Sequence, residues 1–178
     1  LLVTGYTNSN QRIAKLYTND GSGVFSEVQG TPFDGVSFSS VAFADVDNDN
    51  DQDVLITGYN DNNQRISKLY LNNGSGFFSL AAGTPFQGVS FGSVAFADVD
   101  NDGDFDLIVT NWEQANQLFI NENGVFTEVT DSEIAEVGIN SFGSTFGDID
   151  NDGDLDLLIL NSYNDNHFSN SVFINDGN

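Results

Sequence analysis

The 178-residue chain contains no cysteine. This absence excludes disulfide bonds and zinc sites built from thiolates, and it leaves the redox compartment open. The sequence also lacks a run of about 18 apolar residues, the length that a membrane-spanning helix needs, so we expect no insertion into a membrane. No signal peptide is visible, although a chain that starts at Leu1 rather than at Met leaves room for one upstream.

Basic residues are scarce. The chain has 27 acidic residues but only four basic ones, Arg12, Lys15, Arg65 and Lys68, and its formal net charge is -23. Proteins bind nucleic acids and anionic lipid surfaces through Lys and Arg side chains. The charge therefore predicts no nucleic-acid partner and no attraction to such membranes. Because the chain itself supplies so few counter-ions, its carboxylates need cations from solution.

A nine-residue pattern rich in aspartate occurs three times, as DVDNDNDQD from Asp45, DVDNDGDFD from Asp98 and DIDNDGDLD from Asp148. Carboxylates this close together repel one another, and burial would keep some of them protonated unless a cation is present. Ca²⁺ accepts six to eight oxygen ligands in a tolerant geometry, whereas Mg²⁺ demands a stricter one and keeps its waters. The pattern therefore predicts three Ca²⁺ sites, with Mg²⁺ as the weaker alternative. With the loop positions numbered one to nine, the candidate metal residues are Asp45, Asp47, Asp49, Asp51 and Asp53, then Asp98, Asp100, Asp102, Asp104 and Asp106, and then Asp148, Asp150, Asp152, Asp154 and Asp156.

Two other interpretations of these loops are weaker. An EF-hand also begins D-x-D-x-D-G, but it needs a bidentate Glu at position twelve, where this chain has Ile56, Val109 or Ile159. A solvated acidic loop without a metal is the second alternative. Three copies in one register, each between apolar segments, argue against it.

The chain repeats itself. A shift of 53 residues carries Leu1–Tyr6 onto Val54–Tyr59, Gln11–Tyr17 onto Gln64–Tyr70, and Gly30–Phe33 onto Gly83–Phe86. The next shift, from Asp98 to Asp148, is 50 residues, and its connecting segment, 131–140, has diverged. A period near 50 residues indicates a propeller, a solenoid or a similar array.

Each repeat contains four predicted strands. The first, as in Ser93–Ala97, alternates large and small residues, which suits a crowded innermost strand. The second, Asp106–Thr110, is apolar on both faces and should be covered on both. The third, Leu118–Asn121, ends in Asn before an Asn-Gly turn, and the fourth begins near Phe126. Four strands per repeat match one propeller blade.

We therefore predict an all-β fold, a β-propeller of four-stranded antiparallel blades, with a single domain over residues 1–178. The blades are expected at about 1–30 (partial), 38–81, 92–131 and 142–178 (partial), which makes about 3.5 blades. A closed propeller has at least about four blades. The strand count thus predicts that this is a piece of a longer chain or that a partner copy completes it.

The loops, the blade length, and the Thr-Pro-Phe and Phe-Gly linkers resemble FG-GAP/VCBS repeats, the calcium-binding blades of integrin α-subunit propellers and of many secreted bacterial proteins. The resemblance implies that positions one, three, five and nine bind the ion through their side chains. Position seven (Asp51, Asp104 and Asp154) would contribute its backbone carbonyl. At position six a positive φ is expected, which Gly103 and Gly153 adopt without cost. Asn50 at this place predicts a slightly weaker first site.

The predicted role of the calcium is structural, because no acid, base or nucleophile recurs beside the loops. Free Ca²⁺ is scarce in the cytosol, so we expect a secreted or cell-surface protein. The expected function is a binding or adhesion scaffold for an unidentified protein or glycan ligand, not an enzyme. Two alternatives remain open: a homo-oligomer that forms a surface assembly or filament, and the non-catalytic part of a secreted polysaccharide-active enzyme.

Four further features have a functional and a structural interpretation. His167, the single histidine, is expected at the surface rather than as a ligand or general base. Trp112, followed by Glu113, could stack on a sugar or a peptide, but packing over a blade edge is the preferred interpretation. Asn73-Gly-Ser75 is a glycosylation sequon that also reads as a hairpin turn. The two QRI-x-KLY segments could form a basic stripe, with solvated strand faces as the safer interpretation.

Overall fold

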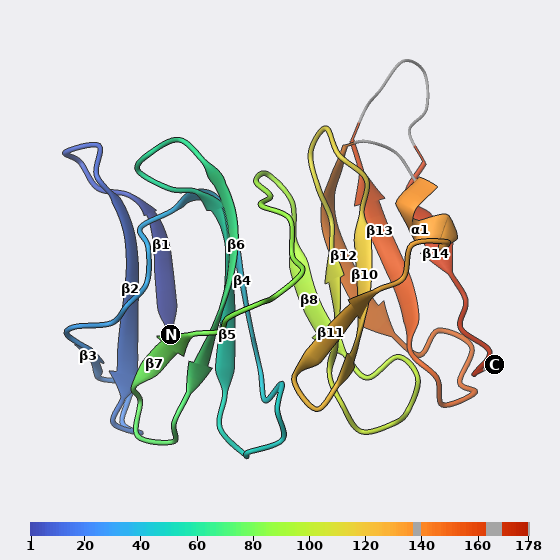
Figure 1. Ribbon diagram of the computed structural model, residues 1–178, viewed down its shortest axis with the longest axis horizontal. Helices are drawn as coiled ribbons and strands as arrows, with labels where there is room; N and C mark the ends of the chain where they lie inside the picture. Colours follow the sequence, from blue (N-terminus) through green and yellow to red (C-terminus); the bar gives the residue numbers. More distant parts are fainter. Residues whose placement is uncertain (137–139, 163–168, 178) are drawn as a thin grey trace.

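The computed structural model describes residues 1–136, 140–162 and 169–177, and almost all of its regular structure is β-strand. The strands form four separate antiparallel sheets, which are called here the first to the fourth blade. Figure 1 shows the sheets side by side in chain order. The first blade contains β1 (Leu2–Tyr6), β2 (Arg12–Asn19) and β3 (Phe25–Glu27); the second β4 (Ser37–Ala44), β5 (Asp53–Tyr59), β6 (Arg65–Asn72) and β7 (Phe78–Leu80); the third β8 (Val94–Ala97), β9 (Asp106–Val109), β10 (Gln117–Glu122) and β11 (Val125–Glu128); the fourth β12 (Ser141–Gly147), β13 (Asp156–Asn161) and β14 (Ser171–Phe173).

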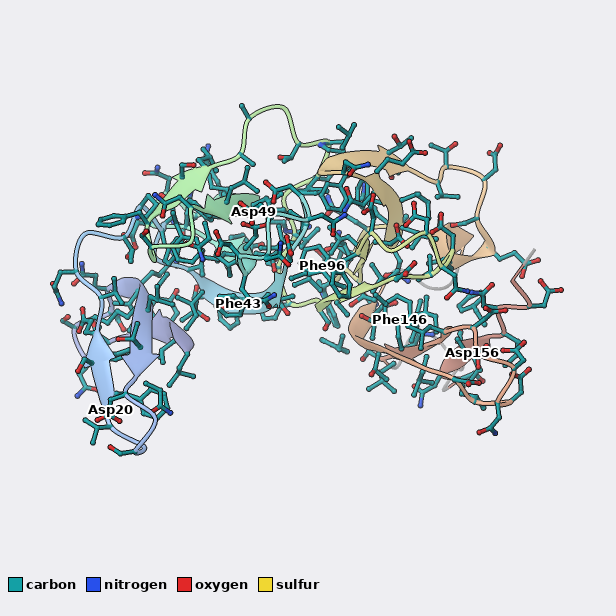
Figure 2. All side chains as sticks on the ribbon, turned by 90° about the horizontal axis from the view of Figure 1, so that it is seen from below. Asp20, Phe43, Asp49, Phe96, Phe146 and Asp156 are labelled. Atoms are coloured by element: carbon teal, nitrogen blue, oxygen red, sulfur yellow. The ribbon has the colours of Figure 1, made fainter. Side chains whose placement is uncertain are left out.

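Each sheet is a meander in which every strand pairs with the next along the chain. The predicted all-β fold of propeller blades is confirmed. The three aspartate-rich segments 45–53, 98–106 and 148–156 are called the first, second and third Asp loop. The strand that precedes each Asp loop is the innermost strand of its blade, since β4 packs against β8 and β8 against β12. Seen from below, the blades follow an arc, with Phe43, Phe96 and Phe146 of these strands toward its inner side (Figure 2).

In the second and third blades the strand after the loop is buried on both faces, as its apolar sequence predicts, whereas in β13 of the fourth blade Leu158 is half-buried and Leu160 is 44% exposed. In β5, Val54, Leu55 and Ile56 are each no more than 1% exposed, and all four residues of β9 are buried. Such double burial is possible because the second and third sheets each lie between two neighbouring blades, whereas the fourth sheet has a described neighbour on one face only. The core therefore lies in the interfaces between blades rather than at a single centre.

An apolar side chain from each linker is inserted between two blades. Phe33 makes edge-to-face contacts with Tyr70 and Phe78 of the second blade, at 4.9 and 5.1 Å between ring centroids. Phe86 repeats this arrangement in the third blade. In the diverged linker a short helix, α1 (Glu133–Glu136), carries Ile134 against the corresponding cluster. The sequence did not predict this helix, because a single turn is too short to show a helical period.

The four basic residues have partners inside the chain. Arg12 donates from Nε to the Ser37 hydroxyl and from its guanidinium to the Asn60 carbonyl, which ties the first blade to the second. Arg65 reaches Glu113 of the third blade at 3.2 Å. Lys15 pairs with Glu27 and Lys68 with Asp34. These side chains thus fasten strands and blades together, a use that the sequence did not reveal. Among the described residues, no helix has the length and apolarity needed to cross a membrane.

Candidate metal centre

Each Asp loop joins the innermost strand of a blade to the strand that pairs with it in the same sheet: β4 to β5, β8 to β9 and β12 to β13. Within each loop the carboxylates at positions one, three and nine converge, with one oxygen from each lying within 4.8 Å of the others. The three groups are Asp45, Asp47 and Asp53; Asp98, Asp100 and Asp106; and Asp148, Asp150 and Asp156. The same three positions come together in every loop, although they are up to eight residues apart in sequence.

The aspartate at position nine is the anchor of the loop. Asp106 begins β9 and is 0% exposed. One of its oxygens accepts the Val99 N–H at 2.8 Å, and the other accepts the Asn121 N–H from β10 at 2.9 Å. Asp53 and Asp156 accept the equivalent pairs of N–H groups. This side chain therefore holds the start of the loop and the third strand of the blade in a fixed relation.

The aspartate at position one folds the loop back on itself. The two oxygens of Asp98 accept the N–H groups of Asp102 and Gly103, both at 3.1 Å. Asp45 does the same for Asp49 and Asn50. The residue at position six has the predicted positive φ in all three loops, 70° for Asn50, 95° for Gly103 and 104° for Gly153.

Position five differs from the other predicted side-chain ligands. Asp49, Asp102 and Asp152 each accept the N–H of position seven at 2.8 to 3.0 Å, and they stand outside the group of three converging carboxylates. At position seven, the side chain of Asp104 is turned to its neighbours, where it accepts the Asn123 N–H at 2.7 Å. In Asp104 this orientation agrees with the resemblance, which implies that position seven contributes its backbone carbonyl and not its side chain.

Burial and mutual repulsion both raise the pKa values of carboxylates in these loops. Burial raises the pKa of Asp106 to about 6 and also raises the pKa of Asp53. Burial first, and then the charge of Asp49, raise the pKa of Asp47. One oxygen of Asp47 is buried without a hydrogen-bond partner among the described residues. Partly desolvated carboxylate oxygens, one of them without a hydrogen-bond partner, are ligands that fit a hard divalent cation.

Two features of the loops were not predicted. Position four is Asn in each copy, and its φ is positive as well, at 59° for Asn48, 60° for Asn101 and 64° for Asn151. The Asn that ends the third strand bridges to the preceding blade, since the side chain of Asn121 donates to the Val46 carbonyl at 2.9 Å. The recurrence of Asn at both places was the available signal, but sequence alone did not indicate its partners.

The remaining candidates take structural positions. Trp112 packs on Phe142, with 4.8 Å between ring centroids, which confirms the packing interpretation. Asn73 accepts the Ser75 N–H in the turn between β6 and β7, so the sequon occupies a hairpin. His167 lies outside the described residues.

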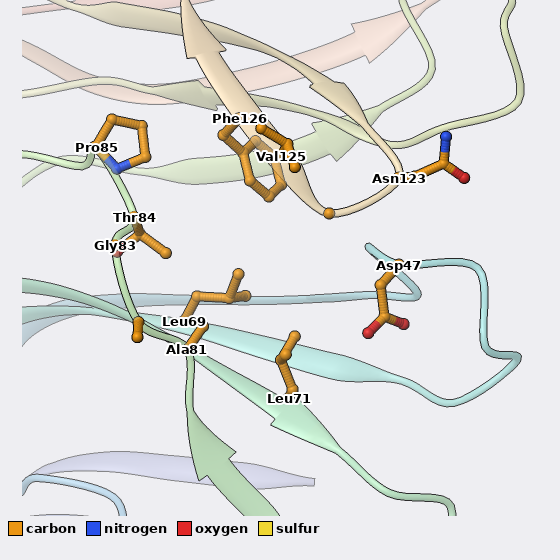
Figure 3. Close-up of a pocket in the computed structure, with 12 residues that line it drawn as sticks. Asp47, Leu69, Leu71, Ala81, Gly83, Thr84, Pro85, Asn123, Val125 and Phe126 are labelled. Atoms are coloured by element: carbon orange, nitrogen blue, oxygen red, sulfur yellow. The ribbon is translucent and has the colours of Figure 1, made fainter.

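A cavity of about 310 Å³ lies beside the first loop, between the second and third blades. Figure 3 shows Asp47 on one side of it, Leu69 and Leu71 along another, and Asn123 and Phe126 opposite. A similar cavity of about 250 Å³ recurs between the first and second blades, lined by Leu16, the Gly30–Pro32 linker and Phe78. The clefts are thus a repeated product of blade packing.

Comparison with known proteins agrees with this architecture. The model of the FG-GAP-like repeat family matches residues 1–56, 45–109 and 98–159. The chain belongs to this family. Among curated protein sequences, none matches the chain.

Among solved structures, an Agrocybe aegerita lectin, described in a study of its specific recognition of non-reducing terminal N-acetylglucosamine, is similar in fold. The TM-score is 0.57 and the identity 17%, and the match covers 94% of this chain and 48% of the lectin. The chain therefore spans about half the length of this relative.

Proposed function

We propose that the chain is a calcium-stabilised segment of an extracellular β-propeller that acts as a binding or adhesion scaffold and not as an enzyme. The observation that carries the proposal is the convergence of the carboxylates at positions one, three and nine in three successive loops. Calcium at each site would neutralise the repulsion within the loop and fix the turn between the innermost strand and the next one.

The extracellular location rests on the calcium supply. Structural sites of this kind need the high free Ca²⁺ of the extracellular space, where modules work with dissociation constants of about 10⁻⁴–10⁻³ M. A net charge of -23 also favours an environment rich in divalent cations.

Thermal unfolding with and without calcium tests the proposal. At a free concentration of about a hundred times its dissociation constant, each ion contributes about 2.7 kcal/mol to stability. We expect Tm to rise on addition of Ca²⁺, to rise less with Mg²⁺, and to fall again with excess EGTA. A Tm that is the same in EGTA and in about 10–100 mM calcium, a hundredfold excess over the dissociation constants given above, would contradict the proposal.

Glycan binding is a second candidate, and the specific observation in its favour is the cleft between the second and third blades. Its lining combines apolar side chains, Leu69 and Leu71, with polar groups such as Asn123. N-acetylglucosamine, the sugar named for the similar lectin, is the first probe to use. Amide shifts of Gly83 and Gly124 on titration would support binding, and Ala82→Trp, which places a large ring at the cleft, should abolish them. Unchanged amides at millimolar sugar would contradict this candidate.

Self-assembly through the end blades is the remaining alternative for the partner. Val3 in β1 and Val172 in β14 are 39% and 53% exposed, so apolar side chains lie open at both ends of the arc. Sedimentation velocity separates the possibilities, because a constant monomer over a wide concentration range rules out assembly of this chain.

A further inference from the structure

Neighbouring Asp loops are joined directly by side-chain hydrogen bonds. The amide of Asn48, at position four of the first loop, donates to an oxygen of Asp104, at position seven of the second loop. Asn101 repeats the contact one blade further on, donating to Asp154 of the third loop at 2.5 Å. The donor and the acceptor occupy the same loop positions at both interfaces, so the contact is a property of the repeat.

The accepting carboxylate, Asp104, is itself part of the second loop. Asp104 is 7% exposed, and its second oxygen accepts the Asn123 N–H, so this carboxylate is held from two sides. It is also the residue whose backbone carbonyl the family resemblance assigns to the metal. A side chain fixed by the preceding blade therefore restricts the backbone of a ligand-bearing residue.

A second connection runs in the opposite direction. The side chain of Asn121 in the third blade donates to the Val46 carbonyl, which lies between the first-loop carboxylates Asp45 and Asp47. The backbone N–H of the same Asn121 holds Asp106, the buried carboxylate of the second loop. Asn175 makes the equivalent pair of bonds, to Val99 and Asp156, at the next interface.

At the interface between the second and third blades, a close packing contact adds to this hydrogen-bonded connection. The nearest atom to a Cβ built on Gly124, in the hairpin of the third blade, is the Cβ of Asp47, at 3.2 Å. The hairpin thus rests on a first-loop carboxylate while its Asn123 N–H binds Asp104 of the second loop. Movement of one loop changes the position of groups that shape the next.

We propose that Asn48 and Asn101 are positioning residues that couple each calcium loop to the following one, so that calcium in one loop raises the affinity of its neighbour. The inference rests on the proposed calcium sites. An ion bound by Asp45 and Asp47 fixes the turn that carries Asn48, and the ordered Asn48 then holds Asp104 in its binding position. By linkage, occupation of the second loop favours the first by the same factor. Couplings between sites are commonly about 5- to 150-fold, and a single partly exposed contact places this one near fivefold.

Because the backbone at position four is left-handed, the Asn at this position can be replaced by Gly without strain. Glycine adopts the φ of 59° at Asn48 without strain, so Asn48→Gly removes the amide and leaves the charge and the turn unchanged. Asn151→Gly is the matched control. It makes the same change in the third loop, where the Asn side chain makes no contact with another loop in the described part of the chain.

The measured quantity is the calcium affinity of the neighbouring loop, which Asn48→Gly would leave unchanged if Asn48 acted only within its own loop. The backbone amides of Gly103 and Gly153 report the second and third sites separately in a calcium titration followed by NMR. Asn48→Gly should raise the calcium concentration that half-converts Gly103 by about fivefold. Asn101→Gly should do the same for Gly153, and Asn151→Gly should leave Gly103 unchanged.

The outcomes separate the coupling from the calcium sites themselves. A wild-type spectrum that does not respond to calcium overturns the sites and the coupling together. A Gly103 midpoint that Asn48→Gly leaves at the wild-type value, in a protein that still binds calcium, overturns only the coupling. The Asn101→Gly and Gly153 pair repeats the measurement at the second interface, so loss of folding in one variant does not prevent the test.

Discussion

Replacing Asp106 by Asn should reduce the stabilisation by calcium and should change the stability of the metal-free protein by a smaller amount. In the absence of metal, the substitution removes a carboxylate that is 0% exposed and whose pKa is raised from 3.8 to about 6. Charging such a group in the folded protein costs about 3 kcal/mol at neutral pH. The same substitution replaces one of two accepting oxygens by an amide donor, and a lost hydrogen bond to a charged group costs about 1.5–3 kcal/mol. Because the two effects oppose each other, we expect a net change below about 2 kcal/mol.

In saturating calcium, Asp106→Asn should be clearly less stable than the wild-type protein. Wild-type protein gains about 2.7 kcal/mol from each site at a hundredfold excess over the dissociation constant, and Asp106→Asn should lose the gain from the second site. For a chain of this length, 1 kcal/mol shifts Tm by about 2–4 °C, so the calcium-induced rise in Tm should be smaller by about 5–10 °C.

Differential scanning calorimetry of both proteins, in EGTA and in calcium, measures the four values needed. Asp61→Asn is the charge-matched control, since Asp61 is exposed in the link between β5 and β6 and belongs to none of the three loops. If Asp106→Asn destabilised the protein equally with and without calcium, the carboxylate would be only a structural acceptor, and the metal assignment for this residue would be refuted.

Three other predictions follow from the same geometry. Because the pKa of Asp106 is raised to about 6, its carboxyl group holds a proton more tightly in the folded metal-free protein than in the unfolded chain. The stability of the metal-free protein should therefore fall as pH rises from about 4 to about 6, and the calcium-induced rise in Tm should shrink as pH falls below about 6. A calcium effect that is independent of pH over this range would contradict this linkage. Asn50→Gly relieves the left-handed φ of 70° and should tighten the first site by about two- to fivefold in a competition assay with a chromophoric chelator; equal affinities would show that Asn already fits. Gly92→Ala should cost more than about 2 kcal/mol in urea unfolding, since its Cβ would lie 1.8 Å from the Thr110 carbonyl oxygen, whereas Gly147→Ala, with no atom within 4 Å, should be tolerated.

The blade architecture was accessible from sequence because its signals are local. Alternating and apolar runs of four to six residues define strands, and the Asp loops and Asn-Gly turns separate them. The convergence within each loop was also accessible, since positions one, three and nine are close in the chain and Gly at position six indicates the turn. The positive φ of Asn50 was predicted for the same reason.

Contacts between blades could not be predicted in this way. Asn48 and Asp104 are 56 residues apart, and Asn121 and Val46 are 75 apart, so nothing in the local pattern pairs them. The partners of Arg12 in the second blade could not be predicted either, because they become evident only when the blades are packed. The side-chain direction of Asp102 depends on a backbone N–H two residues away, a detail that alternating aspartates do not reveal.

If three calcium ions hold these loops together, the metal content of the protein will show it. Equilibrium dialysis against about 10–100 mM calcium, a hundredfold excess over the expected dissociation constants, should give three ions per chain by elemental analysis and by anomalous diffraction from crystals soaked at the same concentration. Each ion should lie among the carboxylates of Asp45, Asp98 or Asp148 and their loop partners. Protein that leaves dialysis without bound calcium, with all three loops empty, would refute the assignment of these loops as calcium sites.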